Sequence, residues 1–458
     1  MLNLDASGQL AALREKTIST RELMEETLDR IERLNPKVNA IVALRDRDAL
    51  LDEAELAPAG PLQGLPMAIK DLAETAGITT TFGSPIFKGH VPQHDAPMVA
   101  RLRKAGAVFI GKTNTPEFGL GSHSYNPIYG VTRNPYNTSR SAGGSSGGAG
   151  AALASRMLAL ADGSDMMGSL RNPAGWNNVF GFRPSYGLVA ESAPGDMFLA
   201  QLSTNGPMAR SMRDLELLLS VQSEHDRGHP HSIGPYRSGA ERGKQRIGWL
   251  GDWGGAYPLE PGILSLCETA LEALDALGHE VQILPPPVPA DALWDAWTVL
   301  RSWAISAKHA PLLKHPHDLL KPELHWEIER GLSLRPEEIL KASEIRSDWF
   351  RYTATMPVDI LALPSAQMFP FEATLRWPDK IGDVPMDTYH RWMEVVVPAS
   401  LTGLPALSVP AGFGEAGLPM GLQLIGHRGR DREVLALGRD YEATQDWVSR
   451  QPRLPSLA

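Results

Sequence analysis

The sequence predicts an α/β fold, built on a mostly parallel or mixed β-sheet with helices packed against it. The first observation is that short apolar runs typical of buried strands alternate with longer segments of helical periodicity. The second is that the 458 residues contain no internal repeat and no low-complexity tail, and that the proline-rich connections resemble surface loops. The third is the composition, with 43% apolar and 21% charged residues, which is ordinary for a folded protein with a sizeable core.

The first 60 residues are predicted to be helical. Ser19 followed by Glu22 has the spacing of a capping box, and apolar residues then recur at helical intervals up to Pro36, where we expect the helix to end. Strand-like runs follow at 66–69, 108–110, 157–161, 246–250, 280–284, 360–363 and 421–425, with a helix at 262–276. The stretch from about 290 to 395 is helical and rich in tryptophan. Trp294 and Trp297 share one helix face there, and core packing is favoured over contact with a substrate.

Charge, cysteine content and hydropathy argue against several classes of protein. The net charge is −9, which argues against a nucleic acid partner because phosphate binding needs clustered Lys and Arg. The single cysteine, Cys267, cannot form an intrachain disulfide and is expected to be a buried thiol. The N-terminus lacks the layout of a signal peptide, and no apolar run is long enough to span a bilayer. We therefore expect a cytoplasmic protein that does not bind membranes.

The most unusual segment is SAGGSSGGAG at 141–150, which has five glycines among ten residues. A flexible linker is one interpretation, but helix-forming residues follow at once, which favours a loop that approaches a ligand inside the fold. A phosphate-binding loop would need a lysine at its end, and none follows. GSSGG does match the nucleophile elbow of α/β-hydrolases, but the acid and histidine partners of that motif are not marked.

Two further segments could contribute to such a site. A second serine-bearing turn, GSDMMGSLRNPA, follows at 163–174. Upstream, Lys70 ends an otherwise apolar strand. Such a lysine is more often a surface charge, but burial would lower its pKa and allow the neutral amine to accept a proton. The residues alone do not name an enzyme.

These segments belong to a longer series of motifs. GLPMAIKD (64–71), KTNTPEF (112–118), NPIYGVTRNPYN (126–137), the two serine segments and GFRPSYGLV (181–189) stand in order, and SLTGLPALSVPAGF (400–413) and GLPMGLQLIG (417–426) follow. In this series the chain resembles the amidase signature family of Ser–cisSer–Lys amidohydrolases. The resemblance implies a single-domain α/β fold over 1–458, whose central mixed, largely parallel sheet is covered by helices on both faces. It also implies N-terminal helices at 1–60, a signature core at 61–210 and a variable helical substrate-side region at 290–395.

The resemblance implies a catalytic triad as well. Ser169 matches the nucleophile of the family, Ser145 the bridging serine and Lys70 the base. The bridging serine of the family follows a cis peptide bond, so the Gly144–Ser145 bond is expected to be cis. In this arrangement Lys70 must be neutral, and Ser145 passes the proton of Ser169 to it. No cofactor and no metal is implied.

The surroundings of the nucleophile are implied in the same way. The backbone amides of Met166, Met167, Gly168 and Ser169 match the oxyanion hole, and Gly119 matches a substrate-binding position whose backbone faces the substrate. Many members carry two glycines before the nucleophile. Met167 departs from that pattern, and we expect it to avoid a positive φ and to narrow the pocket.

The function implied is hydrolysis of the C–N bond of a small neutral or aromatic amide through an acyl-enzyme on Ser169. A carbamate (urethane) hydrolase with the same triad is the alternative. An amidotransferase A-type subunit is less favoured, because segment 190–206 does not resemble that of such subunits. A membrane-associated fatty-amide hydrolase and an inactive binding protein are also less favoured. A metal site in the loop that carries His225, His229 and His231 is disfavoured too, since no further ligands are spaced to complete it. A homodimer remains open.

Overall fold

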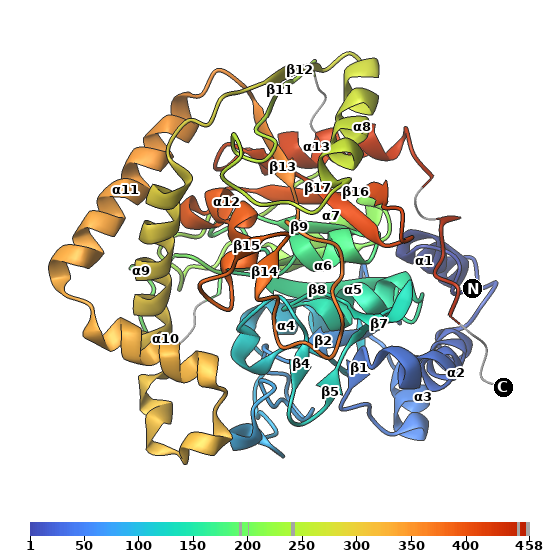
Figure 1. Cartoon of the computed structure of the whole chain (residues 1–458). Coiled ribbons are helices and arrows are strands. Elements are labelled where there is room, and N and C mark those ends of the chain that lie inside the picture. The colour runs from blue at the N-terminus through green and yellow to red at the C-terminus, as the bar shows by residue number, and fades with distance from the viewer. Residues whose placement is uncertain (192–194, 200, 240–242, 447–448, 455–458) are drawn as a thin grey trace.

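The protein is described by a computed structural model that covers residues 1–191, 195–199, 201–239, 243–446 and 449–454. An eight-stranded mixed sheet forms its centre (Figure 1). The strands lie in the order β12 (Glu280–Ile283), β11 (Arg246–Trp249), β13 (Ile360–Pro364), β17 (Pro419–Gly426), β16 (Ala406–Phe413), β9 (Phe180–Arg183), β10 (Thr204–Ala209) and β8 (Leu160–Asp165).

The mixed sheet was expected, but the expectation that it is largely parallel is wrong. β11 pairs in parallel with both β12 and β13, whereas each of the other five pairings in the sheet is antiparallel. The reason is that β16 and β17 form a hairpin and that β10 returns between β8 and β9. Alternating strand and helix signals cannot reveal such returns, because a strand has the same sequence pattern in either direction.

A second, three-stranded sheet carries the lysine motif. It contains β1 (Ile41–Val42), β3 (Val108–Thr113) and β2 (Pro66–Lys70), with β2 and β3 in parallel. β2 lies against β8, and the backbone N–H of Lys70 donates to the Asp162 carboxylate at 3.0 Å. The end of β2 is therefore fixed beside the edge strand of the large sheet.

Helices cover both faces of the large sheet, as expected. Leu407 of β16 points to one face of the sheet, where it contacts Gly438 of α13. Gly438 also lies close to Met212 of α7, so α13 and α7 cover this face. The next residue, Ser408, points to the opposite face, where α6 packs closely at Gly175. Among the described residues, the helices of this part of the chain are α1 (Ala6–Arg14), α2 (Thr20–Val38), α3 (Arg47–Glu55), α4 (Pro97–Lys104), α5 (Gly147–Ala154), α6 (Arg171–Trp176), α7 (Met212–Gln222), α8 (Ile263–Ala276), α12 (Val397–Thr402) and α13 (Asp431–Glu442). Of these, α2 and α3 pack against the three-stranded sheet.

Helix α2 begins as predicted and ends later. Ser19 and Glu22 form the capping box, but α2 continues past Pro36 to Val38 and ends at Asn39, which has a left-handed conformation. Pro36 lies in the last turn, where the missing N–H costs only one hydrogen bond. The predicted strand at 157–161 also begins later, at Leu160, and continues to Asp165.

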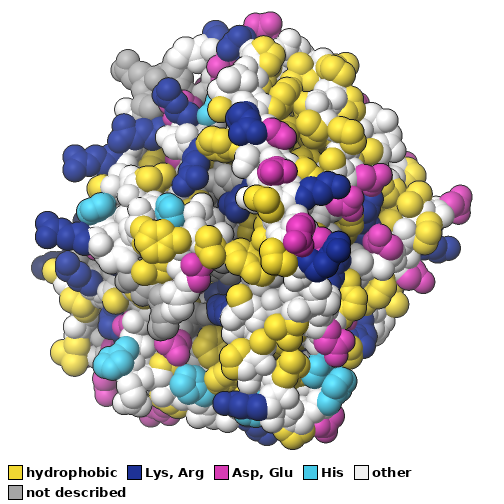
Figure 2. Space-filling model, turned by 90° about the vertical axis from the view of Figure 1, so that its left-hand side faces the viewer, with side chains coloured by type: hydrophobic (Ala, Val, Ile, Leu, Met, Phe, Trp, Pro, Cys, Tyr) yellow, Lys and Arg dark blue, Asp and Glu magenta, His cyan; other side chains and the backbone are white. Residues whose placement is uncertain are grey.

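Three further helices form a layer of their own beside the sheet (Figure 1). They are α9 (Ala290–His309), α10 (Pro322–Ser333) and α11 (Pro336–Thr355), and α9 packs against both of the others. Trp294 and Trp297 are buried in the core, which confirms the prediction for this helix face. On the side that Figure 2 shows, apolar side chains are interspersed with Lys, Arg, Asp and Glu. No helix among the described residues is long and apolar enough to cross a membrane.

Candidate active site

Lys70 stands at the end of β2 and is fully buried. Burial penalises the charged ammonium and lowers the pKa of Lys70 from 10.5 to about 7. The carboxylates of Asp162 and Asp165 act in the opposite direction, but burial has the larger effect. A large fraction of Lys70 is therefore in the neutral form near pH 7. The interpretation of Lys70 as a surface charge is wrong.

Three serine hydroxyls surround the Lys70 amine. Its Nζ lies 2.8 Å from Ser145 Oγ, 2.8 Å from Ser146 Oγ and 3.0 Å from Ser164 Oγ, with the Ser164 carbonyl at 3.3 Å. The Gly144–Ser145 peptide bond is cis, as expected. The structure therefore brings together Lys70 and Ser145, two residues that are 75 positions apart in the sequence.

The glycine-rich loop is embedded in the fold, which excludes the linker interpretation. A Cβ at Gly144 would lie 2.8 Å from the backbone nitrogen of His123, and one at Gly148 would lie 2.3 Å from that of Asn114. Such distances leave no room for a side chain. The glycines at these two positions let the serine loop approach the neighbouring backbone closely, and this approach holds Ser145 in place.

Ser169 lies in the turn between β8 and α6 and is 6% exposed. Its carbonyl accepts a hydrogen bond of 3.3 Å from the backbone N–H of Ser146, which ties the two serine segments together. Among the described residues, its hydroxyl makes no hydrogen bond, either to Ser145 or to Lys70. The three predicted residues thus lie near one another, with Ser145 bonded to Lys70 and the Ser169 backbone bonded to Ser146.

A buried carboxylate shapes the turn that carries Ser169. Asp165 accepts hydrogen bonds from Arg171 at 3.1 Å and from Arg183 at 3.2 Å, and all three side chains are inaccessible to solvent. Although burial acts to raise it, the two guanidinium groups hold the pKa of Asp165 well below its usual range. Asp165 and Arg171 therefore form a buried ion pair within the turn.

This carboxylate also changes the expected oxyanion hole. The backbone N–H of Gly168 donates to Asp165 at 2.9 Å, so the prediction that Gly168 supplies an oxyanion donor is wrong in this conformation. The N–H groups of Met166, Met167 and Ser169 have no hydrogen-bond partner among the described residues. Three of the four expected donors remain available.

Gly168 has a different function in the turn. Its φ is +77°, and a Cβ there would lie 2.9 Å from both methyl groups of Val396. Both observations require glycine. Met167, as expected, has no positive φ, but its side chain packs in the hydrophobic core. The partly exposed side chain is that of Met166, so the expectation that Met167 narrows the pocket is not supported.

Gly119 lies beside the reacting groups. Its φ is +73°, and a Cβ there would be 3.5 Å from Ser145 Oγ and 2.8 Å from the Leu72 side chain. The positive φ favours glycine at this position, whereas a Cβ would make only an ordinary contact with Ser145. The assignment of Gly119 to substrate binding stays a prediction.

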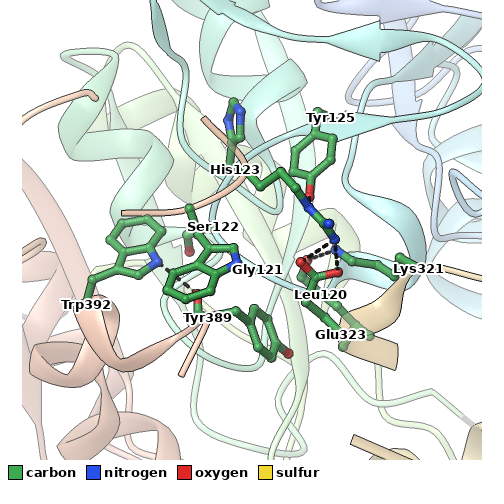
Figure 3. A pocket seen from close by; sticks show the side chains of 11 residues that line it. Leu120, Gly121, Ser122, His123, Tyr125, Lys321, Glu323, Tyr389 and Trp392 are labelled. Carbon is green, nitrogen blue, oxygen red and sulfur yellow. Dashed lines mark hydrogen bonds and ion pairs between the residues drawn. The ribbon is translucent and has the colours of Figure 1, made fainter. Parts of the chain in front are cut away.

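A small cleft begins at the next residues of this segment (Figure 3). Aromatic side chains line it together with the ion pair between Arg376 and Glu323, whose atoms are 2.7 Å apart. Ser122 also lines the cleft, and its buried hydroxyl has no hydrogen-bond partner among the described residues. The cleft shares the segment from Leu120 to His123 with the wall of the serine site.

The sequence did not reveal every group at the site. Ser164 and Asp162 were not identified, although both lie on β8 and contact Lys70. Asp162 is buried, and its pKa is raised to about 6 by burial. Ser164 stands within the second serine motif and could have been found there. Asp162 carries no sequence signal, because its importance depends on β2 lying next to β8.

Other predicted features lie away from this centre. The rings of His229 and His231 are 6.0 Å apart, and among the described residues no three His, Cys, Asp or Glu side chains are grouped to hold a metal ion. In segment 190–206, residues 192–194 and 200 lie outside the described residues. Phe198 and Leu199 of this segment are 63% and 61% exposed.

The comparisons with known proteins agree with this geometry. The profile of the Amidase family matches residues 22–435. The chain is 31% identical to an acylamidase of Rhodococcus erythropolis, over 98% of this chain and 97% of that protein. It is 33% identical to the A subunit of the glutamyl-tRNA(Gln) amidotransferase of a Cyanothece species, over 96% and 97% of the two chains.

Solved structures are similar over the whole length. A bacterial aryl acylamidase of the amidase signature enzymes superimposes with a TM-score of 0.90 at 26% identity, covering 99% of both chains. A 6-aminohexanoate cyclic dimer hydrolase gives a TM-score of 0.88 at 29% identity, also over 99% of both chains. The chain therefore belongs to the Amidase family, that of the amidase signature enzymes, and is an amidohydrolase of this family.

Proposed function

We propose that the protein hydrolyses the C–N bond of a small neutral or aromatic amide through an acyl-enzyme on Ser169, with Ser145 as proton relay and Lys70 as base. The observation that carries the proposal is the 2.8 Å contact between Ser145 Oγ and the buried Lys70 amine, whose pKa lies at about 7. A base with a pKa near the working pH is suited to proton transfer.

The serines around Lys70 support a particular orientation of its amine. A neutral amine has two hydrogens and one lone pair, which can accept one proton. Ser146 Oγ and the Ser164 oxygens lie within 3.3 Å of Nζ and can accept both hydrogens. The lone pair then points to the Ser145 hydroxyl, which donates to it.

The reaction follows from this orientation. Ser169 Oγ attacks the amide carbon and transfers its proton to Ser145, which passes its own proton to Lys70. The tetrahedral oxyanion accepts hydrogen bonds from the free amides of Met166, Met167 and Ser169. The proton returns along the same path to the amide nitrogen, the C–N bond breaks, and the amine leaves.

The second half of the reaction uses the same groups. Water takes the place of the amine and gives a proton to the relay as it attacks the Ser169 ester. The intermediate collapses to a carboxylic acid, and the proton returns to Ser169 Oγ, so the enzyme is restored. Losing one oxyanion donor typically lowers the rate by about 10² to 10³. Carbamate hydrolysis would use the same steps, with a carbamoyl or carbonate ester on Ser169.

A fluorophosphonate probe tests the proposal. We expect it to label the wild type and the Ser220→Ala control, since the Ser220 hydroxyl bonds only to Leu217 in its own helix. Ser169→Ala should not be labelled. Equal labelling of Ser169→Ala and the wild type would refute Ser169 as nucleophile. A panel of aryl amides, aliphatic amides and aryl carbamates then separates the amide from the carbamate activity.

Transfer of ammonia to a partner protein is the second candidate. Its support is the 33% identity to the A subunit of an amidotransferase over nearly the whole chain. The measurement is glutaminase activity, alone and after co-purification of a partner. Release of ammonia from glutamine that exceeds hydrolysis of aryl amides would favour this candidate.

The cytoplasmic location and a homodimer remain predictions.

A further inference from the structure

The wall of the serine site that faces the helical layer is mostly apolar. Phe118 and Leu120, the neighbours of Gly119, pack in one hydrophobic cluster with Met166 of the oxyanion turn. Ile305 of α9 and Leu324 of α10 belong to the same cluster. Helices α9 and α10 therefore meet both the segment beside Ser145 and the turn before Ser169.

One guanidinium stands in this wall. Arg301 of α9 is only 3% exposed. Its Nε donates to Glu327 Oε1 at 2.6 Å and its Nη2 to the Tyr389 hydroxyl at 2.7 Å. Tyr389 donates in turn to Glu327 at 2.9 Å, and Ser302 donates to the second oxygen of Glu327 at 2.7 Å. These bonds fix the position of the guanidinium and satisfy both oxygens of the Glu327 carboxylate.

The third nitrogen of Arg301, Nη1, has no oxygen acceptor among the described residues. The only hydrogen-bond partner of Nη1 in the described part of the chain is the sulfur of Met166, at 3.5 Å. A thioether is a weak acceptor for the two N–H groups that this nitrogen carries. By contrast, Nη1 of the buried Arg171 donates to the Val396 carbonyl at 3.1 Å and to Gln423 at 2.7 Å. A buried guanidinium nitrogen without an oxygen acceptor costs free energy unless a ligand supplies one.

Met166 places this nitrogen next to the reaction. It stands three residues before Ser169 in the same turn, and its side chain is partly exposed. Tyr389, which fixes Arg301, also lines the cleft of Figure 3, and a Cβ at Gly121 would lie 3.8 Å from its ring. Arg301 Nη1 thus lies between the oxyanion turn and the cleft.

We propose that Arg301 is a specificity residue, which binds a neutral oxygen acceptor of the substrate, such as a ketone, ether or nitro oxygen, away from the scissile bond. The acceptor takes the place of the Met166 sulfur at Nη1. It is neutral because Glu327 already balances the charge of Arg301, and a buried carboxylate needs a cation of its own. This inference rests on the proposed function, because it names the substrate class of the Ser169 site.

Matched substrates test the proposal. One pair is 4-acetylbenzamide and 4-isopropylbenzamide, with the substituent on the acyl side. The second pair carries the same groups on the ring of an acetanilide. The measured quantity is the ratio of kcat/KM within each pair, together with the concentration of each compound that halves fluorophosphonate labelling. Comparing this ratio between variants cancels the intrinsic reactivity of the substrates.

Arg301→Lys keeps a cation for Glu327 but has no Nη1, and Arg330→Lys is the matched control on α10. Arg330 is partly exposed and donates to Thr298. In one of the two pairs we expect Arg301→Lys to reduce the preference for the acetyl compound by about tenfold to a hundredfold, as for a hydrogen bond to a charged group. Arg330→Lys should keep the wild-type ratio.

Three results would overturn the proposal. The first is an unchanged ratio in Arg301→Lys for both pairs. The second is an equal loss of kcat/KM for both members of a pair, accompanied by slower labelling of Ser169. This result would mean that Arg301 only supports the oxyanion turn. The third is a wild-type preference for a 4-carboxy substituent over 4-acetyl, which would exclude a neutral acceptor. Labelling at Ser169 tests the proposed function and the ratio tests Arg301, so either can fail without the other.

Discussion

The acid limb of the pH profile should report the protonation of Lys70. The fall of its pKa from 10.5 to about 7 corresponds to roughly 5 kcal/mol in favour of the neutral amine. Only the neutral amine accepts a proton, so activity requires the deprotonated form. Above pH 7 most of the enzyme is then active. The active fraction is about one tenth at pH 6 and about one hundredth at pH 5.

The assay is kcat/KM for an anilide between pH 5 and 9, since this parameter reports the free enzyme. Circular dichroism at each pH serves as the control that the protein stays folded. We expect a tenfold fall per pH unit below a midpoint near 7. A profile that is flat down to pH 5 would refute Lys70 as base. A profile that still rises at pH 9 would refute the lowered pKa of Lys70.

Three further predictions test the surroundings of Lys70 and Ser169. Asp162→Asn removes a carboxylate that favours the charged lysine, so the midpoint of the acid limb should move to lower pH; a midpoint at higher pH would contradict this. Ser164→Ala should lower kcat by about tenfold with KM nearly unchanged, because one acceptor of the amine hydrogens is lost, and Ser164→Thr should recover most of it. An unchanged kcat in Ser164→Ala would exclude this orienting function. Gly168→Ala should destabilise the protein by about 1–2 kcal/mol from its φ of +77° alone, measured by urea unfolding, and should slow labelling of Ser169. Wild-type stability and labelling would contradict the requirement for glycine in this turn.

Short local patterns predicted local conformation well, because each pattern carries its own backbone geometry. The cis bond before Ser145 and the capping box at Ser19 are examples. Properties that depend on neighbouring strands were harder to predict. The antiparallel course of β9 and β10 was missed because strand direction leaves no trace in the hydrophobic pattern.

The errors at the site also arise because a local motif does not report contacts between distant segments of the chain. Asp162 matters only because β8 lies beside β2, which no local motif reports. The Gly168 amide was assigned to the oxyanion by resemblance, yet in this chain Asp165 accepts its hydrogen bond. Arg301 lies on α9, outside the long motifs, and its contact with Met166 exists only in the folded protein.

The most direct test of the central claim is to locate the acyl group on the protein. Rapid acid quenching after mixing with a 4-nitrophenyl ester, followed by digestion and mass spectrometry, identifies the acylated residue. The proposed mechanism predicts the acyl group on Ser169, and its loss in Ser169→Ala. An acyl group on Ser145, or turnover of the ester without any covalent species, would contradict it.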